Sequence, residues 1–441
     1  MKRLLPLLLC AVLALFCATT AQAAGVSITL TASEYALHYA FDAGAQDLFV
    51  ILEYTTPAEK GWMMLYSEDG HFEGDVSLAY SGAGGKTSVA LTSARTTGSI
   101  GKASTTLPKA ADYQKPTGKS NAKVMDFVLT ETPEGFHYAF NAAGTDYMLL
   151  YWRSKEQTVT QPVYPDENGH YEGDVVSELT FARTQFTVQV KSGSGSMKKE
   201  ATVRKGYQAP EAPQRQEGRL SGVTVCIDAG HQENGRFVNE PIGPGLSGST
   251  SGKGGMAQGT KTNRRESIVC LEIGMLLRDE LLRQGANVVM TREDQTTFHT
   301  NIERCEIAEA GGAQIMLRLH CNNSSNRSKR GIQVYGPLNS DYAKAVADAD
   351  TYREMGQKLL DAMKTRVGMT LANSTGMARL NDNYVGNNWA KMMCFLVEMG
   401  YLSNPAEEYL LVTPVYQQWL AEGMADGVYE IAVARGWVQA Q

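Results

Sequence analysis

Four residues in the second half of this 441-residue chain could together carry out hydrolytic chemistry. His231, Glu266 and His320 offer two imidazoles and one carboxylate, the ligand set of a catalytic zinc ion whose fourth position stays open for water. Glu398 adds a second carboxylate. Each residue also has a structural interpretation, as a turn residue, a strand-end histidine or an acid at a helix N-terminus. The spacing alone is not diagnostic and leaves both interpretations open.

The elements around these residues indicate how they could meet. Three of the four follow apolar runs that we expect to be strands, at 223–227 before His231, 314–319 before His320 and 393–397 before Glu398. Glu266 starts a segment with helical spacing. The predicted helices are 265–283, 302–310, 342–365 and two after Asn404 and Thr413, with further strands at 287–291 and 332–335. Strand–helix alternation predicts an α/β doubly wound fold with a mainly parallel sheet, whose site lies at the carboxyl ends of the strands.

Five segments, in this order, carry a family resemblance: Cys226 to His231, Arg265 to Ser267, Val289 to Arg292, Leu317 to Asn322 and Phe395 to Asn404. Through them, residues 221 to about 436 resemble the zinc-dependent N-acetylmuramoyl-L-alanine amidases, which cut bacterial peptidoglycan. Two features depart from the family pattern. A long Gly/Ser-rich insertion follows His231, and Cys321 stands where a small residue is usual. We interpret Cys321 as a packed thiol, with a zinc-ligand role as the alternative.

The resemblance implies specific roles. One zinc ion is held by His231, Glu266 and His320, and Glu398 moves protons while the amide between N-acetylmuramic acid and L-alanine is hydrolysed. Asp228 either orients a zinc ligand or caps the turn at the end of its strand. Substrate contacts are expected from residues on polar segments near the site, including the loop-like stretch 379–384, with solvated loops as the alternative: Arg304, Asn322, Asp382, Tyr384 and Asn388.

The N-terminus predicts export. Lys2 and Arg3 precede an apolar run, 4–16, and Ala21-Gln22-Ala23 is typical of a signal-peptidase site, so 1–23 is interpreted as a signal peptide. The run is shorter than the about 20 residues of a membrane-spanning helix. We therefore expect a secreted protein, and the amidase resemblance implies that it is associated with the cell wall. The net charge of −6 gives no overall basic footprint for nucleic acid.

The first half of the mature chain contains a duplication. Residues 38–41 recur at 137–140, and 70–76 recur in similar form at 169–175. Alternating β-rich runs and Gly/Asn/Asp turns predict two tandem all-β sandwich modules, 24–116 and 122–210, then a linker, 211–220, and the zinc domain, 221–441. Within the repeated motif, we interpret His71, Glu73 and Asp75 first as turn residues. A role in binding a metal or another ligand is the alternative. A wall or envelope ligand for the modules remains open.

Two other functions compete with the zinc amidase. One is a wall-binding or adhesion protein with an inactive amidase-like domain, and the other is a zinc peptidase acting on stem peptides. The five cysteines that follow the predicted signal peptide all fall in the zinc domain, mostly within predicted strands or helices: Cys226, Cys270, Cys305, Cys321 and Cys394. An odd number placed this way predicts packed thiols and no disulfide framework.

Overall fold

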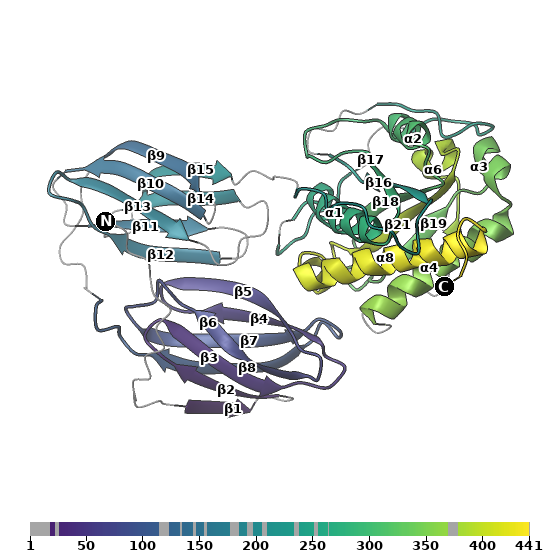
Figure 1. Ribbon diagram of the computed structural model, residues 1–441. Helices are drawn as coiled ribbons and strands as arrows, with labels where there is room; N and C mark the ends of the chain where they lie inside the picture. The colour runs from purple at the N-terminus through teal and green to yellow at the C-terminus, as the bar shows by residue number, and fades with distance from the viewer. Residues whose placement is uncertain are drawn as a thin grey trace.

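The computed structural model shows two β-rich units followed by an α/β domain (Figure 1). It describes residues 18–22, 26–113, 123–132, 135–143, 147–153, 157–176, 185–191, 197–204, 210–232, 238–250, 255–262, 264–368 and 378–440. Each part has a buried apolar cluster of its own. The three parts nevertheless touch, and these contacts shape the surfaces described below.

The first β-rich unit contains two sheets, with strand orders β1-β2-β3-β6 and β5-β4-β7-β8. Its strands are β1 (Ala18–Gln22), β2 (Ser27–Ala32), β3 (Ala36–Asp42), β4 (Phe49–Thr55), β5 (Glu59–Tyr66), β6 (His71–Ser77), β7 (Gly85–Ser93) and β8 (Ser99–Leu107). Apolar side chains from both sheets meet in one cluster that includes Ile28, Phe41 and Leu52. The alternation of buried and exposed residues along β8 is the period of two that a half-buried strand requires.

Apart from β1, which has no counterpart among the described residues, the second β-rich unit follows the same strand order, with sheets β9-β10-β13 and β12-β11-β14-β15. Its strands are β9 (Val124–Thr132), β10 (Gly135–Ala142), β11 (Met148–Arg153), β12 (Gln157–Val163), β13 (His170–Val176), β14 (Gln185–Lys191) and β15 (Met197–Arg204). The repeated motifs pair in the same register in both units: His38 lies opposite Asp75 in the first, and His137 opposite Asp174 in the second. The duplicated sequence therefore forms duplicated strand pairs.

Main-chain pairing joins the two units. Residues 157–159 of β12 lie antiparallel to residues 59–61 of β5, with Thr158 opposite Lys60. One eight-stranded sheet results, in the order β15-β14-β11-β12-β5-β4-β7-β8. Figure 1 shows β12 beside β5 where the two units meet.

Strand β1 lies inside the segment interpreted as a signal peptide. It pairs with β2 from Ala18↔Thr31 to Gln22↔Ser27. Cleavage near Ala23, which stays a prediction, would remove β1 and leave β2 at the edge of its sheet. Within the described part of the chain, no helix has the length and apolar character needed to cross a membrane.

The α/β domain is built on a six-stranded sheet, in the order β17-β16-β18-β21-β19-β20. The strands are β16 (Thr224–Ala229), β17 (Asn287–Met290), β18 (Ile315–Asn322), β19 (Gln333–Gly336), β20 (Arg379–Leu380) and β21 (Met393–Tyr401). The central strands are parallel, as predicted, but β19 runs antiparallel to β21, so the sheet is mixed.

The helices are α1 (Glu266–Arg283), α2 (Asn301–Ala310), α3 (Asp341–Val346), α4 (Ala349–Val367), α6 (Val385–Trp389), α7 (Glu407–Leu410) and α8 (Pro414–Ala434). The single helix predicted at 342–365 is wrong. Ala347 is extended, and Asp348 starts a new helix by accepting a hydrogen bond from the Thr351 amide, 2.7 Å away. The predicted loop at 379–384 contains the short strand β20 at its start.

Alternate residues of the central strands pack on opposite faces of the sheet. Ile227, Leu317 and Phe395 belong to a large cluster with α1, α4 and α8, whereas Met316 and Cys394 belong to a smaller one with α2 and α6. Helices therefore cover both faces. His320 and Glu398 have the same parity as Met316 and Cys394 and lie near the carboxyl ends of their strands.

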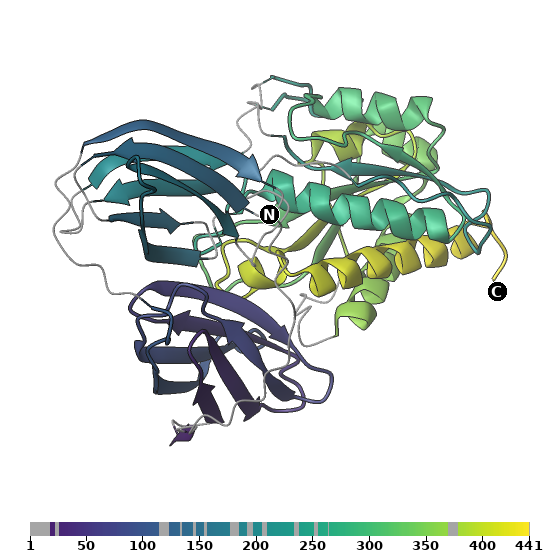
Figure 2. The same ribbon diagram turned by 60° about the vertical axis from the view of Figure 1, so that its left-hand side comes forward.

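The first β-rich unit packs directly on the α/β domain. Phe49, Ile51 and Trp62, from the outer face of its sheet, belong to the same buried cluster as the residues around α8. Phe49 contacts Trp419 with ring centroids 5.3 Å apart. Figures 1 and 2 both place this unit, in purple, beside the yellow C-terminal segment.

Candidate metal centre

His231 enters the site from the turn after β16. Its φ of 55° is in the left-handed region that non-glycine residues rarely adopt, a conformation often held at functional sites. Gly230 precedes it, and its amide donates to the Leu319 carbonyl at 2.9 Å. A Cβ at this glycine would lie 2.4 Å from the Leu319 carbonyl oxygen and 2.7 Å from Cε1 of His320. The turn can therefore approach β18 only because residue 230 has no side chain.

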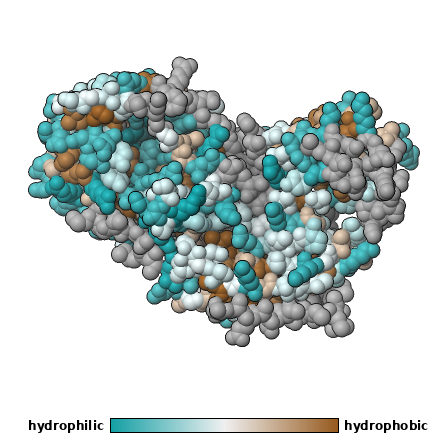
Figure 3. All heavy atoms as spheres, turned by 180° about the vertical axis from the view of Figure 1, so that it is seen from behind, coloured by the Kyte–Doolittle hydropathy of each residue, from teal (hydrophilic) through white to brown (hydrophobic). Residues whose placement is uncertain are grey.

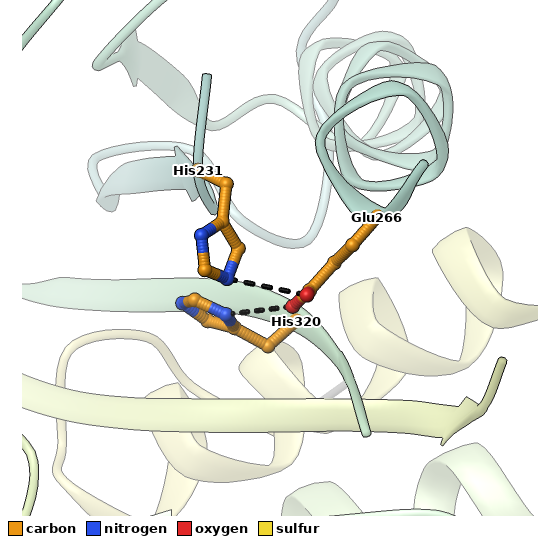
Figure 4. Close-up of side chains that lie close together, drawn as sticks. All are labelled: His231, Glu266 and His320. Atoms are coloured by element: carbon orange, nitrogen blue, oxygen red, sulfur yellow. Dashed lines mark hydrogen bonds and ion pairs between the residues drawn. The ribbon is translucent and has the colours of Figure 1, made fainter. Parts of the chain in front are cut away.

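The three predicted zinc ligands converge (Figure 4). Glu266, at the first position of α1, points its carboxylate between the two imidazoles. Oε2 lies 3.2 Å from Nε2 of His231, and Oε1 lies 3.0 Å from Nδ1 of His320. Amides of Ala257 and Cys321 also donate to this carboxylate, at 2.8 and 3.0 Å. These bonds fix the carboxylate in the position from which it faces both histidines.

The side chains fit a metal ion. One donor atom from each of His231, Glu266 and His320 lies within 4.8 Å of the others. Burial alone would raise the pKa of Glu266, but its hydrogen bonds to the two histidines outweigh burial and lower that pKa. Burial lowers the pKa of His320, which favours the neutral imidazole that a metal requires, and its Nε2 is buried without a hydrogen-bond partner among the described residues. Two imidazoles and one carboxylate suit zinc.

Glu398 lies beside this centre. On β21 it is directly opposite His320 of β18 on one side and Gln333 of β19 on the other. Burial, and then the negative charge of Glu266, raise the pKa of Glu398 to about 8. Its Oε2 is buried and makes no hydrogen bond within the described residues. A buried carboxyl group with a raised pKa and a free oxygen is suited to accepting and releasing a proton.

Asp228 supports the site from below. It is fully buried, and its two carboxylate oxygens pair with Arg304 and with Arg318 Nε, the latter at 2.9 Å. Thr291 donates to the same carboxylate at 2.8 Å. Burial alone would raise the pKa of Asp228, but the two guanidinium groups lower it. These contacts do not show Asp228 orienting a ligand histidine directly. Its carboxylate binds the two arginines, and among the described residues only Arg304 connects it to the His231 carbonyl.

The structure separates the five residues expected to contact substrate. Arg304 and Asn388 are buried. The Arg304 guanidinium binds Asp228, the Ala229 carbonyl and Gln232, so its hydrogen bonds are used within the protein. The Asn388 amide donates to the carbonyls of Ile242 and Asp382. Both side chains therefore stabilise the fold. Their burial could not be predicted from the sequence, because both are polar residues in segments without a clear hydrophobic period.

The other three are less buried. Asp382 accepts hydrogen bonds from the amides of Leu338 and Asn339, which makes it a loop clamp. Asn322 donates to Gln333 at 3.0 Å. The Tyr384 ring is 5.2 Å from that of Tyr335, and burial, then the charge of Glu398, raise its pKa. Asn322 and Tyr384 therefore lie toward Glu398, and their contact with substrate stays a prediction.

Several residues around the site were not singled out from the sequence. Gln333 Oε1 accepts hydrogen bonds from the hydroxyls of Tyr335, at 3.0 Å, and Tyr401, at 3.3 Å. Arg292 is buried, and its guanidinium donates to the carbonyls of Ala229, Gly230 and Ser267. It thus ties the turn before His231 to the start of α1. In the sequence, the feature that could have marked Arg292 as a site residue is its position directly after a predicted strand.

Two acids of α7 hold the loops that flank the centre. Buried Glu408 accepts from the amides of Lys261, at 2.8 Å, and Thr262, at 3.1 Å, just before α1. Buried Glu407 accepts from the amides of Gly331 and Tyr401, each at 2.8 Å. Burial raises the pKa of Glu407 to about 7, although both amides oppose that shift.

All five cysteines of the domain are free and buried, which confirms the interpretation as packed thiols. Cys321 is next to His320 in sequence, but its thiol interacts with that of Cys270, and burial raises its pKa well above the usual value. A thiol in this state is a poor metal ligand.

Comparison with known proteins finds similarity to one family across most of the α/β domain. A family model described as N-acetylmuramoyl-L-alanine amidase matches residues 225–430. The germination-specific N-acetylmuramoyl-L-alanine amidase of Bacillus subtilis is 26% identical over 231 residues, covering 49% of this chain and 83% of that protein. The probable cell wall amidase LytH of Staphylococcus aureus is 27% identical over 218 residues, covering 48% of this chain and 60% of that protein.

Solved structures match a similar share of the chain. An N-acetylmuramoyl-L-alanine amidase from Clostridium difficile 630 is 24% identical with a TM-score of 0.38, covering 48% of this chain and 96% of its own. Ami1 from Mycobacterium abscessus is 20% identical with a TM-score of 0.43, covering 48% of this chain and 99% of its own.

Proposed function

We propose that this chain is an N-acetylmuramoyl-L-alanine amidase, the family whose model matches residues 225–430, and that it uses one zinc ion to hydrolyse the amide between N-acetylmuramic acid and L-alanine in peptidoglycan. The observation that carries the mechanism is the placement of Glu398 directly opposite His320, beside three converging ligand side chains. A metal site with an adjacent buried carboxyl group is what amide hydrolysis by water needs.

His231, Glu266 and His320 would hold the zinc ion, which when bound acts as a Lewis acid and lowers the pKa of bound water. Glu398 takes a proton from the attacking water as the new carbon–oxygen bond forms. It then delivers the proton to the L-alanine nitrogen as the carbon–nitrogen bond breaks. A pKa raised by burial and by the Glu266 charge lets Glu398 hold that proton near neutral pH.

We further propose that the chain is exported and acts at the cell wall, with residues 1–23 removed. In this proposal the two β-rich units are tandem copies of one sandwich module, 24–116 and 122–210. The shared strand order and the matching His38↔Asp75 and His137↔Asp174 registers support a common origin. The modules would attach the enzyme to a wall ligand.

The test is the analysis of fragments released from purified peptidoglycan. We expect stem peptides with a free L-alanine amine, and no release after chelation. Glu398→Gln should lower the rate by about 10²- to 10⁴-fold, because general acid–base catalysis contributes a factor of that size. Cleavage between stem amino acids would identify a peptidase instead. Full activity of Glu398→Gln would contradict the mechanism.

A further inference from the structure

A hollow lies where the three parts of the molecule meet. Its volume is about 770 Å³, and it is lined by the outer face of the first unit's sheet, by Thr158 of the second unit, and by Lys261 and Tyr409 of the α/β domain. It is separate from the metal centre, since none of His231, Glu266, His320 or Glu398 lines it. Figure 3 shows the molecule from behind, with hydrophilic surface in teal and white on both lobes and smaller hydrophobic patches in brown.

The floor of the hollow is an ordered row of polar side chains. Thr158, Lys60, Thr55, Ser88 and Ser104 lie directly opposite one another across five neighbouring strands. Adjacent strands are about 4.8 Å apart, so the row is about 19 Å long. The next row along the strands contains Trp62, Glu53, Ala90 and Lys102. The row from Thr158 to Ser104 is therefore long enough to lie along an extended polymer.

The lining carries an excess of positive charge. Four of its sixteen residues are lysines and one is acidic, although the whole chain has a net charge of −6. Lys60, Lys86, Lys102 and Lys261 are exposed, and none forms an ion pair within the described residues. Like charges gathered in a concave surface repel one another and attract anions. The local charge is thus opposite to that of the molecule, and the protein itself does not neutralise it.

We propose that this hollow binds an extended anionic polymer of the cell wall, whose phosphates or carboxylates pair with the four lysines while its hydroxyl groups bond to the row of threonines and serines. A single small anion could not span the row. The choice of a wall polymer rests on the proposed function, whereas the preference for anions rests on the hollow alone. Lys261 directly precedes Thr262 in the loop held by Glu408, so a bound polymer would lie beside the segment that leads to Glu266.

The test uses the full chain in sedimentation with purified walls. Wall phosphates and wall carboxylates are distinguished by comparing untreated walls with walls stripped of phosphodiester-linked polymers by hydrofluoric acid. The variant is Lys86→Glu with Lys102→Glu, which reverses two exposed charges on β7 and β8. The matched control is Lys123→Glu with Lys344→Glu, two exposed lysines outside the hollow.

We expect the Lys86→Glu/Lys102→Glu variant to bind walls about tenfold more weakly, and wild-type binding to weaken with added salt. Loss of wild-type binding on stripped walls would identify phosphates, and unchanged wild-type binding there would identify carboxylates. Equal binding by the variant and the control would overturn the proposal. Hydrolysis of a soluble muramyl peptide, measured in parallel, should be the same in wild type, variant and control. No hydrolysis by wild type would contradict the proposed function but leave the binding result intact.

Discussion

Trp62 of β5 and Tyr409 of α7 meet edge to face across the junction between the first β-rich unit and the α/β domain, with ring centroids 4.5 Å apart and ring planes at 70°. Tyr409 follows Glu407 and Glu408, whose carboxylates hold the loops on either side of the metal centre. The β-rich unit therefore packs against the short helix that supports the site.

Trp62→Ala should destabilise the chain by about 3–5 kcal/mol, because it removes a large buried side chain from a core that the two parts share. Urea unfolding followed by tryptophan fluorescence measures the loss. A double-mutant cycle that combines Trp62→Ala with Tyr409→Leu should show a coupling free energy of about 0.5–1.5 kcal/mol, the range for aromatic pairs. Strictly additive effects would mean that the two rings do not stabilise each other. Tyr164→Ala, at an exposed tyrosine, is the control.

Asp228→Asn should cost about 3–5 kcal/mol, because Arg304 and Arg318 would remain buried without their counter-charge. Asp350→Asn is the matched control. Asp350 pairs with Arg353 at 2.6 Å but its side chain is 93% exposed, so its removal should cost at most about 1 kcal/mol. Similar losses of unfolding free energy in the two variants would show that burial does not set the strength of the Asp228 pairs.

Gly230→Ala should disturb the metal centre although it changes none of the three ligand residues. The new methyl group would meet the Leu319 carbonyl and the His320 ring, so one of them must move. We expect zinc affinity to fall by about 10- to 100-fold, as when groups that orient ligands are altered. Competition with a chelating dye measures it. Gly255→Ala has open space around its Cβ and should bind zinc like wild type.

Glu407 should make stability depend on pH. Its pKa is raised from 4.5 to about 7 in the folded state, so its contribution is fully present below about pH 4.5 and is lost as pH rises through 7. The shift corresponds to a loss on the order of 3 kcal/mol. Glu407→Gln should remove this slope, though it weakens one of the two amide contacts. Unfolding from pH 5 to 8 should show wild type losing stability relative to the variant, and parallel curves would contradict the shift. Glu306→Gln, at an exposed acid, is the control.

Metal removal should affect stability as well as activity. Wild type should contain about one zinc ion per chain and unfold at a lower temperature after chelation, because an ion bound to the folded state stabilises it. His320→Ala should contain none, and its unfolding temperature should not respond to chelator. Glu398→Gln should keep its zinc, since Glu398 is outside the converging donor set. Metal analysis and thermal unfolding together check these outcomes.

The sequence was sufficient for the framework of the site. The apolar runs that lead to His231, His320 and Glu398 form strands, and Glu266 begins a helix, as predicted. Strand polarity in an alternating α/β chain brings such ends together, so the convergence was predictable. The break at Ala347 was not, because residues on both sides keep helical spacing and only the cap at Asp348 separates α3 from α4.

Contacts between distant segments were harder to predict. Arg304 and Asn388 are polar, and only the fold shows that Asp228 and two carbonyls occupy their side chains. The packing of the first unit on the α/β domain had a signal in β4, where residues 49–52 are all buried. Four apolar residues in succession indicate a strand covered on both faces, but not what covers the second.

The pairing of β12 with β5 has a consequence for how a duplicated β protein stays dispersed. In isolation, each of these strands would be the outer strand of its sheet, and its unpaired amide and carbonyl groups would be open to strands of other chains. Along residues 59–61 and 157–159, the two β-rich units satisfy these groups in each other. The pairing thus covers part of two strand edges, and a chain carrying only one of the units would expose the corresponding edge to aggregation.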